Sequence, residues 1–118
     1  MWLELARFYK RQQRWNDFDV AMHQALNAPK RDEAVWFDAG EMLIQANRNL
    51  PLAVQTLRKY LESGRTDEYG PAFKAHYLIG QGLEKQGNPR EAQTEYRAAL
   101  SMASGFRPAQ DALHKLGG

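Results

Sequence analysis

The side chains most able to do chemistry in this chain are three histidines and a few pairs of neighbouring acids. The histidines are scattered at positions 23, 76 and 114, without the histidine–glutamate pairing of a zinc-binding helix. The acidic pairs fall at predicted helix starts or in a predicted loop, namely Asp17/Asp19, Asp32/Glu33 and Asp67/Glu68. Negative charge at a helix start complements the helix dipole, so capping explains these acids without catalysis.

Motifs for nucleophilic or phosphate chemistry are also missing from the sequence. The chain has no cysteine, which excludes thiolate catalysis, disulfides and cysteine-ligated metal. It has neither a glycine-rich phosphate loop nor a serine elbow. We therefore expect a protein that is not an enzyme, has no catalytic residues, and needs neither a metal nor a cofactor.

Composition places the chain among ordinary globular proteins. Of its 118 residues, 43% are hydrophobic and 25% charged, and no run of apolar residues is long enough to predict a transmembrane helix. The net charge of +2 is too small to imply an anionic partner. A local basic excess surrounds Arg7, Lys10, Arg11 and Arg14, which we interpret as a solvated helical face rather than a nucleic-acid patch.

Three stretches of the chain repeat one pattern, in which a small residue in one helical run precedes a ladder of apolar residues in the next. The small residues are Ala6, Gly40 and Gly80, separated by 34 and 40 residues. The ladders are Phe18, Met22, Ala25 and Leu26; Ala53, Leu57, Tyr60 and Leu61; and Ala92, Tyr96, Ala99 and Leu100. Apolar residues at this spacing predict amphipathic helices, and the recurrence predicts a fold built from repeated units.

Each copy is predicted to form a helical hairpin. In the third copy, Asn88 and Pro89 supply an N-cap and a proline at the first helical position. Gly80 should lie where the two helices approach closely, whereas Gly82 should not face the partner helix. We also expect four large side chains to be buried and to stabilise the fold by about 1.5–3 kcal/mol each, namely Trp2, Trp36, Tyr96 and Leu100.

The departures from a constant period can be located in the sequence. The turn at residues 47–51 is one residue longer than its counterpart, and five extra residues fall within 62–71. Glycine and proline in that segment predict a loop between the second and third copies. By the same reasoning Pro29 should end the second helix, Ser104 and Gly105 the sixth, and residues 108–116 should form a seventh helix.

A period of about 34 residues with this pattern resembles the tetratricopeptide repeat family across nearly the whole chain. The resemblance implies an all-α fold, a right-handed α-solenoid of three antiparallel helix-turn-helix repeats plus a C-terminal capping helix, in a single domain 1–118. The repeats should span about 1–31, 32–67 and 73–105, and the capping helix about 107–116. Because the first repeat opens almost inside a helix, we expect a piece of a longer array or multidomain protein; the alternative is a native start.

The resemblance further implies a concave groove, lined by the first helix of each repeat, that receives a peptide or partner protein. The family's groove positions correspond to Leu3, Arg7, Lys10 and Arg11; to Ala34, Phe37, Glu41 and Ile44; and to Lys74, Tyr77, Gln81 and Glu84. Phe37, Ile44 and Tyr77 lie outside the packing ladder, so we predict that they are exposed apolar anchors for a partner. The alternative is that the insertion or the C-terminal helix folds back and covers them.

One tetratricopeptide subfamily clamps the acidic tails of heat-shock chaperones with Lys, Asn and Arg side chains. The matching places here hold Leu3, Arg7, Asp38, Lys74 and Leu78, of which only Lys74 fits. Asp38 would repel a carboxylate at short range, so a chaperone-tail adaptor is not expected. A helix or extended segment with apolar anchors, acidic near Arg7, Lys10 and Arg11, suits the groove better.

The sequence thus favours a non-catalytic protein–protein interaction module, part of a larger scaffold or assembly protein, with no nucleic-acid or membrane partner. One alternative is self-association into a homo-oligomer, because the first helix would present Trp2, Leu5 and Phe8 to another copy. A second alternative is RNA binding, since related helical repeats bind single-stranded RNA. The basic run at residues 10–14 is its only support.

Overall fold

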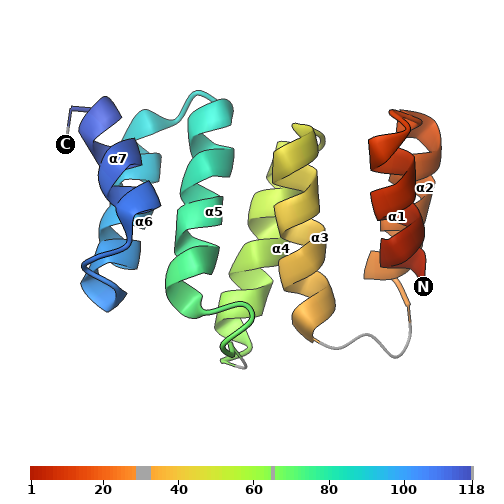
Figure 1. Ribbon diagram of the computed structural model, residues 1–118, viewed down its shortest axis with the longest axis horizontal. Coiled ribbons are helices and arrows are strands. Elements are labelled where there is room, and N and C mark those ends of the chain that lie inside the picture. Colours follow the sequence, from red (N-terminus) through yellow and green to blue (C-terminus); the bar gives the residue numbers. More distant parts are fainter. Residues whose placement is uncertain (29–32, 65, 118) are drawn as a thin grey trace.

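The computed structural model describes residues 1–28, 33–64 and 66–117, and across these residues all regular secondary structure is α-helical. The seven helices lie side by side along the longest axis of the molecule, in the order of the sequence (Figure 1). Their bounds are α1 Trp2–Arg11, α2 Trp15–Leu26, α3 Glu33–Ala46, α4 Leu50–Glu62, α5 Ala72–Lys85, α6 Pro89–Met102 and α7 Arg107–Lys115. The predicted all-α class and the seventh helix are therefore confirmed.

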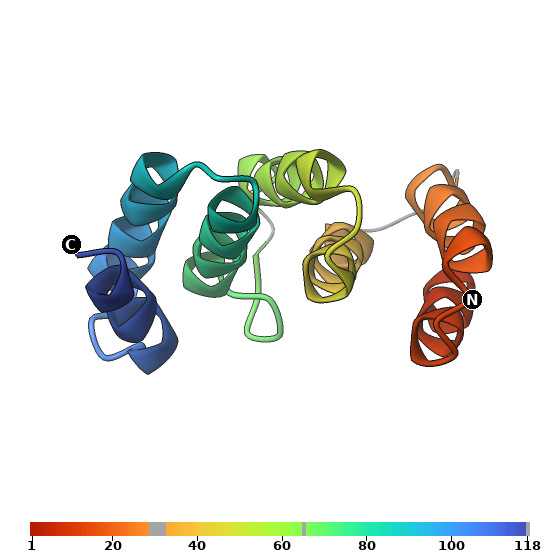
Figure 2. The ribbon, with the colours of Figure 1, turned by 90° about the horizontal axis from the view of Figure 1, so that it is seen from above.

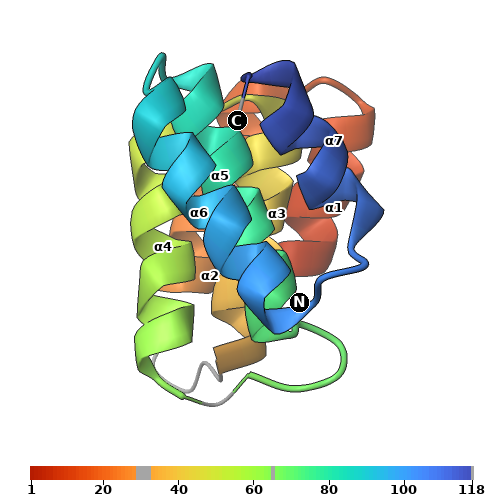
Figure 3. The same cartoon turned by 90° about the vertical axis from the view of Figure 1, so that its left-hand side faces the viewer.

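The helices form three hairpins, α1 with α2, α3 with α4 and α5 with α6, and α7 packs against α6. Seen from above, α2 and α4 lie on one side of the row and α1 and α3 on the other (Figure 2). The view along the row agrees, with α4 on one side and α1 and α7 on the other (Figure 3). We call the side of α1, α3, α5 and α7 the odd-helix face and the side of α2 and α4 the even-helix face.

The turns within the hairpins follow from their residue types. Helix α6 begins at Pro89 after Asn88, as predicted, although the Asn88 side chain makes no capping hydrogen bond. In the longer turn before α4, Asn47 and Asn49 have φ angles of 56° and 44°. Asparagine tolerates this left-handed conformation better than most residues, so both positions suit a tight reversal between helices.

The predicted small residues do face the paired helix. Ala6, Gly40 and Gly80 are all buried. A Cβ atom on Gly40 would lie 2.5 Å from Leu57 Cγ, and one on Gly80 would lie 2.5 Å from Tyr96 Cε1. At Gly40 and Gly80 the ladder residue of the second helix therefore occupies the space that a side chain would need.

As predicted, Gly82 does not face α6, whereas the expected full burial of four large side chains was wrong for three of them. A Cβ on Gly82 would lie 2.9 Å from Val54 Cγ2, so Gly82 also packs closely, but against α4 of the preceding hairpin. Trp2 is 37% exposed, because no described helix covers that side of α1. Trp36 and Leu100 are half-buried, and of the four side chains expected in the core only Tyr96 is fully buried.

The segment between α4 and α5 is a loop, as predicted, and it packs back onto the hairpin before it. The Asp67 carboxylate accepts hydrogen bonds from the backbone N–H groups of Tyr69 (3.0 Å) and Gly70 (2.9 Å). The buried Tyr60 hydroxyl donates to the Gly70 carbonyl at 2.5 Å. Helix α6 ends at Met102, just before Ser104 and Gly105, whereas the predicted stop at Pro29 lies outside the described residues.

Candidate functional site

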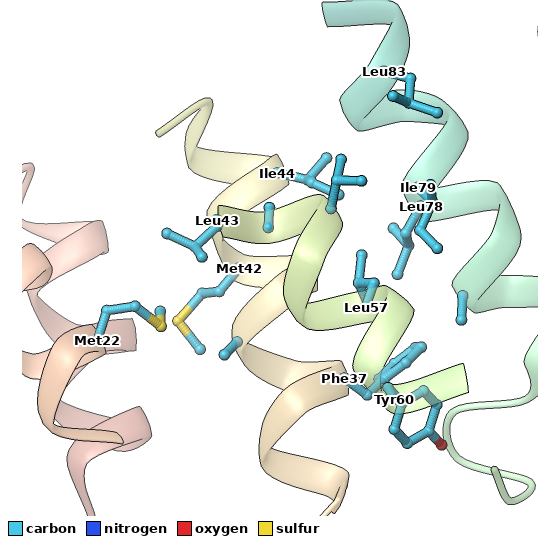
Figure 4. Close-up of a cluster of buried hydrophobic side chains, with 14 of the residues drawn as sticks. Met22, Phe37, Met42, Leu43, Ile44, Leu57, Tyr60, Leu78, Ile79 and Leu83 are labelled. Atoms are coloured by element: carbon cyan, nitrogen blue, oxygen red, sulfur yellow. The ribbon is translucent and has the colours of Figure 1, made fainter. Parts of the chain in front are cut away.

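Two of the predicted groove anchors belong to the core. Phe37 and Ile44 are each about 1% exposed, so their predicted exposure was wrong. Phe37 packs against the ring of Tyr60, with centroids 5.4 Å apart, and both lie together in Figure 4. Ile44 lies beside Gly82 of α5. These side chains lie in the core near the junction between the second and third hairpins, whereas the sequence pattern predicted that they would be exposed to solvent.

The insertion covers Phe37 on its outer side. The Tyr69 ring meets the Phe37 ring edge-on at 6.0 Å, and the Tyr69 hydroxyl donates to Asp38 Oδ1 at 2.9 Å. This hydrogen bond to a carboxylate raises the pKa of the Tyr69 hydroxyl. The ammonium of Lys74 lies 5.7 Å from the centre of the Phe37 ring. Tyr69 itself is 63% exposed and takes the place of Phe37 as an exposed aromatic side chain.

The third predicted anchor, Tyr77 of α5, is half-buried. The ring of Phe106, which precedes α7, meets Tyr77 at right angles with centroids 5.3 Å apart. Gln81 donates to the Tyr77 hydroxyl at 3.0 Å, and burial raises the pKa of that hydroxyl. The alternative stated above therefore applies to two of the three anchors. The insertion covers Phe37 through Tyr69, and the segment before α7 covers Tyr77 through Phe106.

The charged members of the predicted groove are brought together on the odd-helix face. Lys10 of α1 donates to Gln45 Oε1 of α3 at 2.9 Å. Lys74 of α5 pairs with Glu41 of α3 at 3.5 Å. Arg7 and Arg11 are exposed on α1. The positive charge of Arg7 also acts on the Tyr69 hydroxyl, where it partly opposes the rise in pKa caused by Asp38. Polar contacts therefore link α1, α3 and α5 across this face.

A cavity of about 410 Å³ lies on the odd-helix face between α5 and α7. Its lining includes Tyr77, Gln81, Glu84 and Lys85 of α5, Tyr96 of α6, and Pro108, Asp111, Ala112 and Lys115 of α7. The Tyr96 hydroxyl donates to the Glu84 carboxylate at 2.7 Å. Burial and this carboxylate together raise the pKa of the Tyr96 hydroxyl. The structure thus joins the predicted groove residues of α5 to α7, which the sequence analysis considered only as a possible cover for the groove.

A larger cleft of about 630 Å³ lies on the even-helix face, between the first two hairpins. It is lined by Asp19, Met22, His23, Leu26 and Asn27 of α2 and its end, Trp36, Leu43, Asn47 and Arg48 of α3 and the following turn, and Asn49, Leu52, Thr56 and Lys59 of α4 and its N-cap. Arg48 makes two hydrogen bonds to the Asp19 carboxylate, at 2.6 and 3.0 Å, and its guanidinium lies 5.3 Å from the Trp15 ring. None of these residues was predicted to form a site.

His76 serves as a structural residue. Its Nδ1 lies 2.8 Å from Glu95 Oε1, and Arg58 pairs with the other carboxylate oxygen at 3.2 Å. Burial alone would raise the Glu95 pKa, but the His76 hydrogen bond and the Arg58 charge outweigh it and lower that pKa. His23 and His114 are exposed. Within the described ranges no three acidic or histidine side chains form a group suited to a metal ion.

No helix in the described part of the chain is both long and apolar enough to cross a membrane. No family model matches the chain, and no curated protein matches it either. The resemblance to tetratricopeptide repeats, which comes from the three copies of the sequence pattern, therefore stays a prediction.

Proposed function

We propose that this chain is a non-catalytic protein–protein interaction module. In this proposal the hairpins form a right-handed, tetratricopeptide-like α-solenoid within a scaffold or assembly protein, and the odd-helix face binds a peptide or partner protein. The observation that carries the proposal is the polar band linking α1, α3 and α5, through the Lys10–Gln45 and Lys74–Glu41 contacts. Such a continuous row of side chains from successive helices suits an extended ligand.

The burial of Phe37 and Ile44 changes what the partner should look like. At the α1 end, Arg7 and Arg11 are exposed cations, and the exposed ring of Tyr69, whose hydroxyl interacts with the charge of Arg7, provides an aromatic contact. Arginine and tyrosine are both enriched at binding hot spots. We therefore expect a partner segment that carries acidic residues at the α1 end and an apolar or aromatic residue against Tyr69.

Charge reversal on α1 tests this proposal. Partners would be captured from a lysate of the source and identified by mass spectrometry, using the wild type, Arg7→Glu/Arg11→Glu, and the control Arg90→Glu/Arg97→Glu. The control makes the same charge change at exposed positions of α6. We expect the α1 variant to lose the specific partner with unchanged circular dichroism and melting temperature. If the control loses it equally, or the α1 variant keeps it, the odd-helix face is not the binding surface.

A second candidate function, self-association, is favoured by the exposed end of the first hairpin. Met1, Trp2, Phe8 and Val20 are all exposed large apolar side chains there, Phe8 being 42% exposed. In the repeat register Trp2 and Phe8 correspond to Trp36 and Met42, and Met42 points toward Met22 of α2 in Figure 4. Sedimentation at several concentrations tests whether a second copy covers this face, and a monomer throughout would contradict it.

A further inference from the structure

The cleft on the even-helix face has the shape of a trough between two helices. On one side, residues that line the cleft recur from Asp19 in α2 to Asn27 just after it, at intervals of three or four positions, as expected for one face of a helix. Along α4 the lining runs from Asn49 to Lys59 in the same way. At a rise of 1.5 Å per residue these stretches are roughly 12–15 Å long. The cleft is therefore elongated along the helices.

The floor of the trough carries apolar side chains, and its rim is polar, with the asparagines Asn27, Asn47 and Asn49 beside the exposed cation Lys59. Met22 and Leu43 are buried at the bottom, with half-buried Leu26 and Leu52 beside them. The cations Arg48 and Lys59 stand at the rim with His23. Among the described residues of the lining Asp19 is the one acid, and its pair with Arg48 leaves Lys59 as the cation available to a ligand. A ligand that matches this lining carries apolar groups facing inward and carboxylates at its edge.

The residues at equivalent positions explain why the trough is open. At the next junction, Arg58 of α4 and His76 of α5 both bind Glu95 of α6, and together they bridge the hairpins. In the repeat register these three positions correspond to His23, Trp36 and Thr56, all of which line the cleft. Thr56 carries no charge with which to draw the two hairpins together. The carboxylate bridge that closes the second junction therefore has no counterpart at position 56 of the first.

We propose that this trough is a second docking site, which takes the apolar stripe of an amphipathic, acidic helix from a partner protein. Leucine-like side chains at positions i, i+4 and i+7 of that helix enter between α2 and α4. Carboxylates beside the stripe pair with Lys59. A whole helix is about 10–12 Å across, so a trough of 630 Å³ receives the side chains while the helix backbone stays outside. This site is independent of the odd-helix face.

The test uses two synthetic, fluorescein-labelled peptides of about 15 residues with helical leucine spacing. One carries glutamates flanking the leucines and the other carries lysines there. Binding to the whole chain is measured by fluorescence anisotropy, and the site is mapped by ¹⁵N–¹H NMR shifts. We expect the glutamate peptide to bind, the lysine peptide to bind at least about tenfold more weakly, and shifts to cluster on α2 and α4.

Lys59→Glu and Arg97→Glu form a matched pair, because both residues are exposed on helices and only Lys59 lines the trough. Lys59→Glu should weaken the glutamate peptide about tenfold and improve the lysine peptide, while Arg97→Glu changes neither. Absent binding, equal effects of the two variants, or shifts on the odd-helix face would overturn the proposal. Cleft resonances that move with protein concentration alone would also overturn it, since a second copy would then occupy the trough.

Discussion

The junction between the first two hairpins and the junction between the second and third use the same register positions but close to different degrees. Helix α5 packs along α4 more extensively than α3 packs along α2. At the second junction Gly82 admits Val54 into close contact. At the first, a cleft of about 630 Å³ separates α2 from α4. Repetition of a packing pattern therefore does not make the interfaces between successive hairpins equal.

The polar contacts of the two junctions differ in burial. Glu95, which binds Arg58 and His76 at the second junction, has a side chain only 12% exposed. Asp19, which binds Arg48 at the first, is 48% exposed. Exposed ion pairs contribute little to stability, whereas a buried, hydrogen-bonded carboxylate is costly to leave unpaired. The comparison indicates that the second and third hairpins form the more stable part of the chain.

The largest effect is expected from packing inside a hairpin rather than at a junction. Gly80→Ala forces a methyl group into the buried ring of Tyr96, and we expect it to destabilise the fold by about 2–3 kcal/mol. Gly82→Ala brings a methyl group close to a single terminal methyl of Val54, so its packing cost is smaller. Alanine gains about 1 kcal/mol of helix propensity at either position, which offsets most of the cost at Gly82 but not at Gly80. Urea unfolding of both variants measures the difference.

Gly40→Ala is the matched control for Gly80→Ala, because its Cβ would meet Leu57 at the same distance within the second hairpin. It should behave like Gly80→Ala. Equal costs at Gly80 and Gly82 would show that hairpin and junction packing are equally tight, against the distinction drawn here.

Amide hydrogen exchange should show directly that the first hairpin is held less firmly than the third. Because α2 is held by a smaller interface than α6, we expect the first hairpin to open locally with a free energy about 2 kcal/mol lower. Amides in the middle of α2 would then exchange about thirtyfold faster than those in the middle of α6. Both are second helices of their hairpins, which makes them a fair pair. Equal protection of α2 and α6 would mean that the cleft does not weaken the first junction.

A smaller difference is expected from removing one charge at each junction. Glu95→Gln leaves Arg58 and His76 without a carboxylate partner in a half-buried setting, and should cost about 1–2 kcal/mol. Asp19→Asn should cost less than about 0.5 kcal/mol, because its pair with Arg48 is exposed. Thermal and urea unfolding of the two isosteric variants provide the measurement. The reverse ranking would assign the greater stability to the first junction.

The hairpins were predictable from sequence because their packing is local. Gly80 and Tyr96 meet across one short turn, so periodicity and turn residues suffice to place them in contact. The loop before α5 was equally predictable, since Gly70 followed directly by Pro71 is a typical turn signal. Seven helices with these approximate bounds followed from such local signals.

The surfaces were less predictable because they depend on contacts between distant segments. The burial of Phe37 depends on Tyr69, which reaches it from an insertion that the repeat pattern does not describe. The cleft between α2 and α4 lies between helices of different hairpins, and Thr56 in its lining stands where the next junction has the bridging Glu95. The sequence alone shows that Thr56 stands at the repeat position of Glu95. Only the structure, through the contact between His76 and Glu95, shows that this position can bridge two hairpins.

The smallest effect expected is a pH dependence confined to the second junction. The folded-state pKa of Glu95 is lowered, since the His76 hydrogen bond and the Arg58 charge outweigh its desolvation. In the unfolded chain a glutamate titrates near pH 4.3. The unfolded state thus binds more protons, and the stability that Glu95 contributes is present above about pH 4.3 and lost as the pH falls through the lower folded value.

Urea unfolding from pH 6 to pH 3 at constant ionic strength should therefore show the wild type and Glu95→Gln converging. The gap between their free energies of unfolding should narrow by about 1 kcal/mol or less. Because glutamine does not titrate, any pH dependence that both proteins share comes from other groups and cancels in the difference. A gap that stays constant over this range would mean that the Glu95 carboxylate gains nothing from its partners, and the second junction would then owe its closure to apolar packing around Gly82 and Val54 alone.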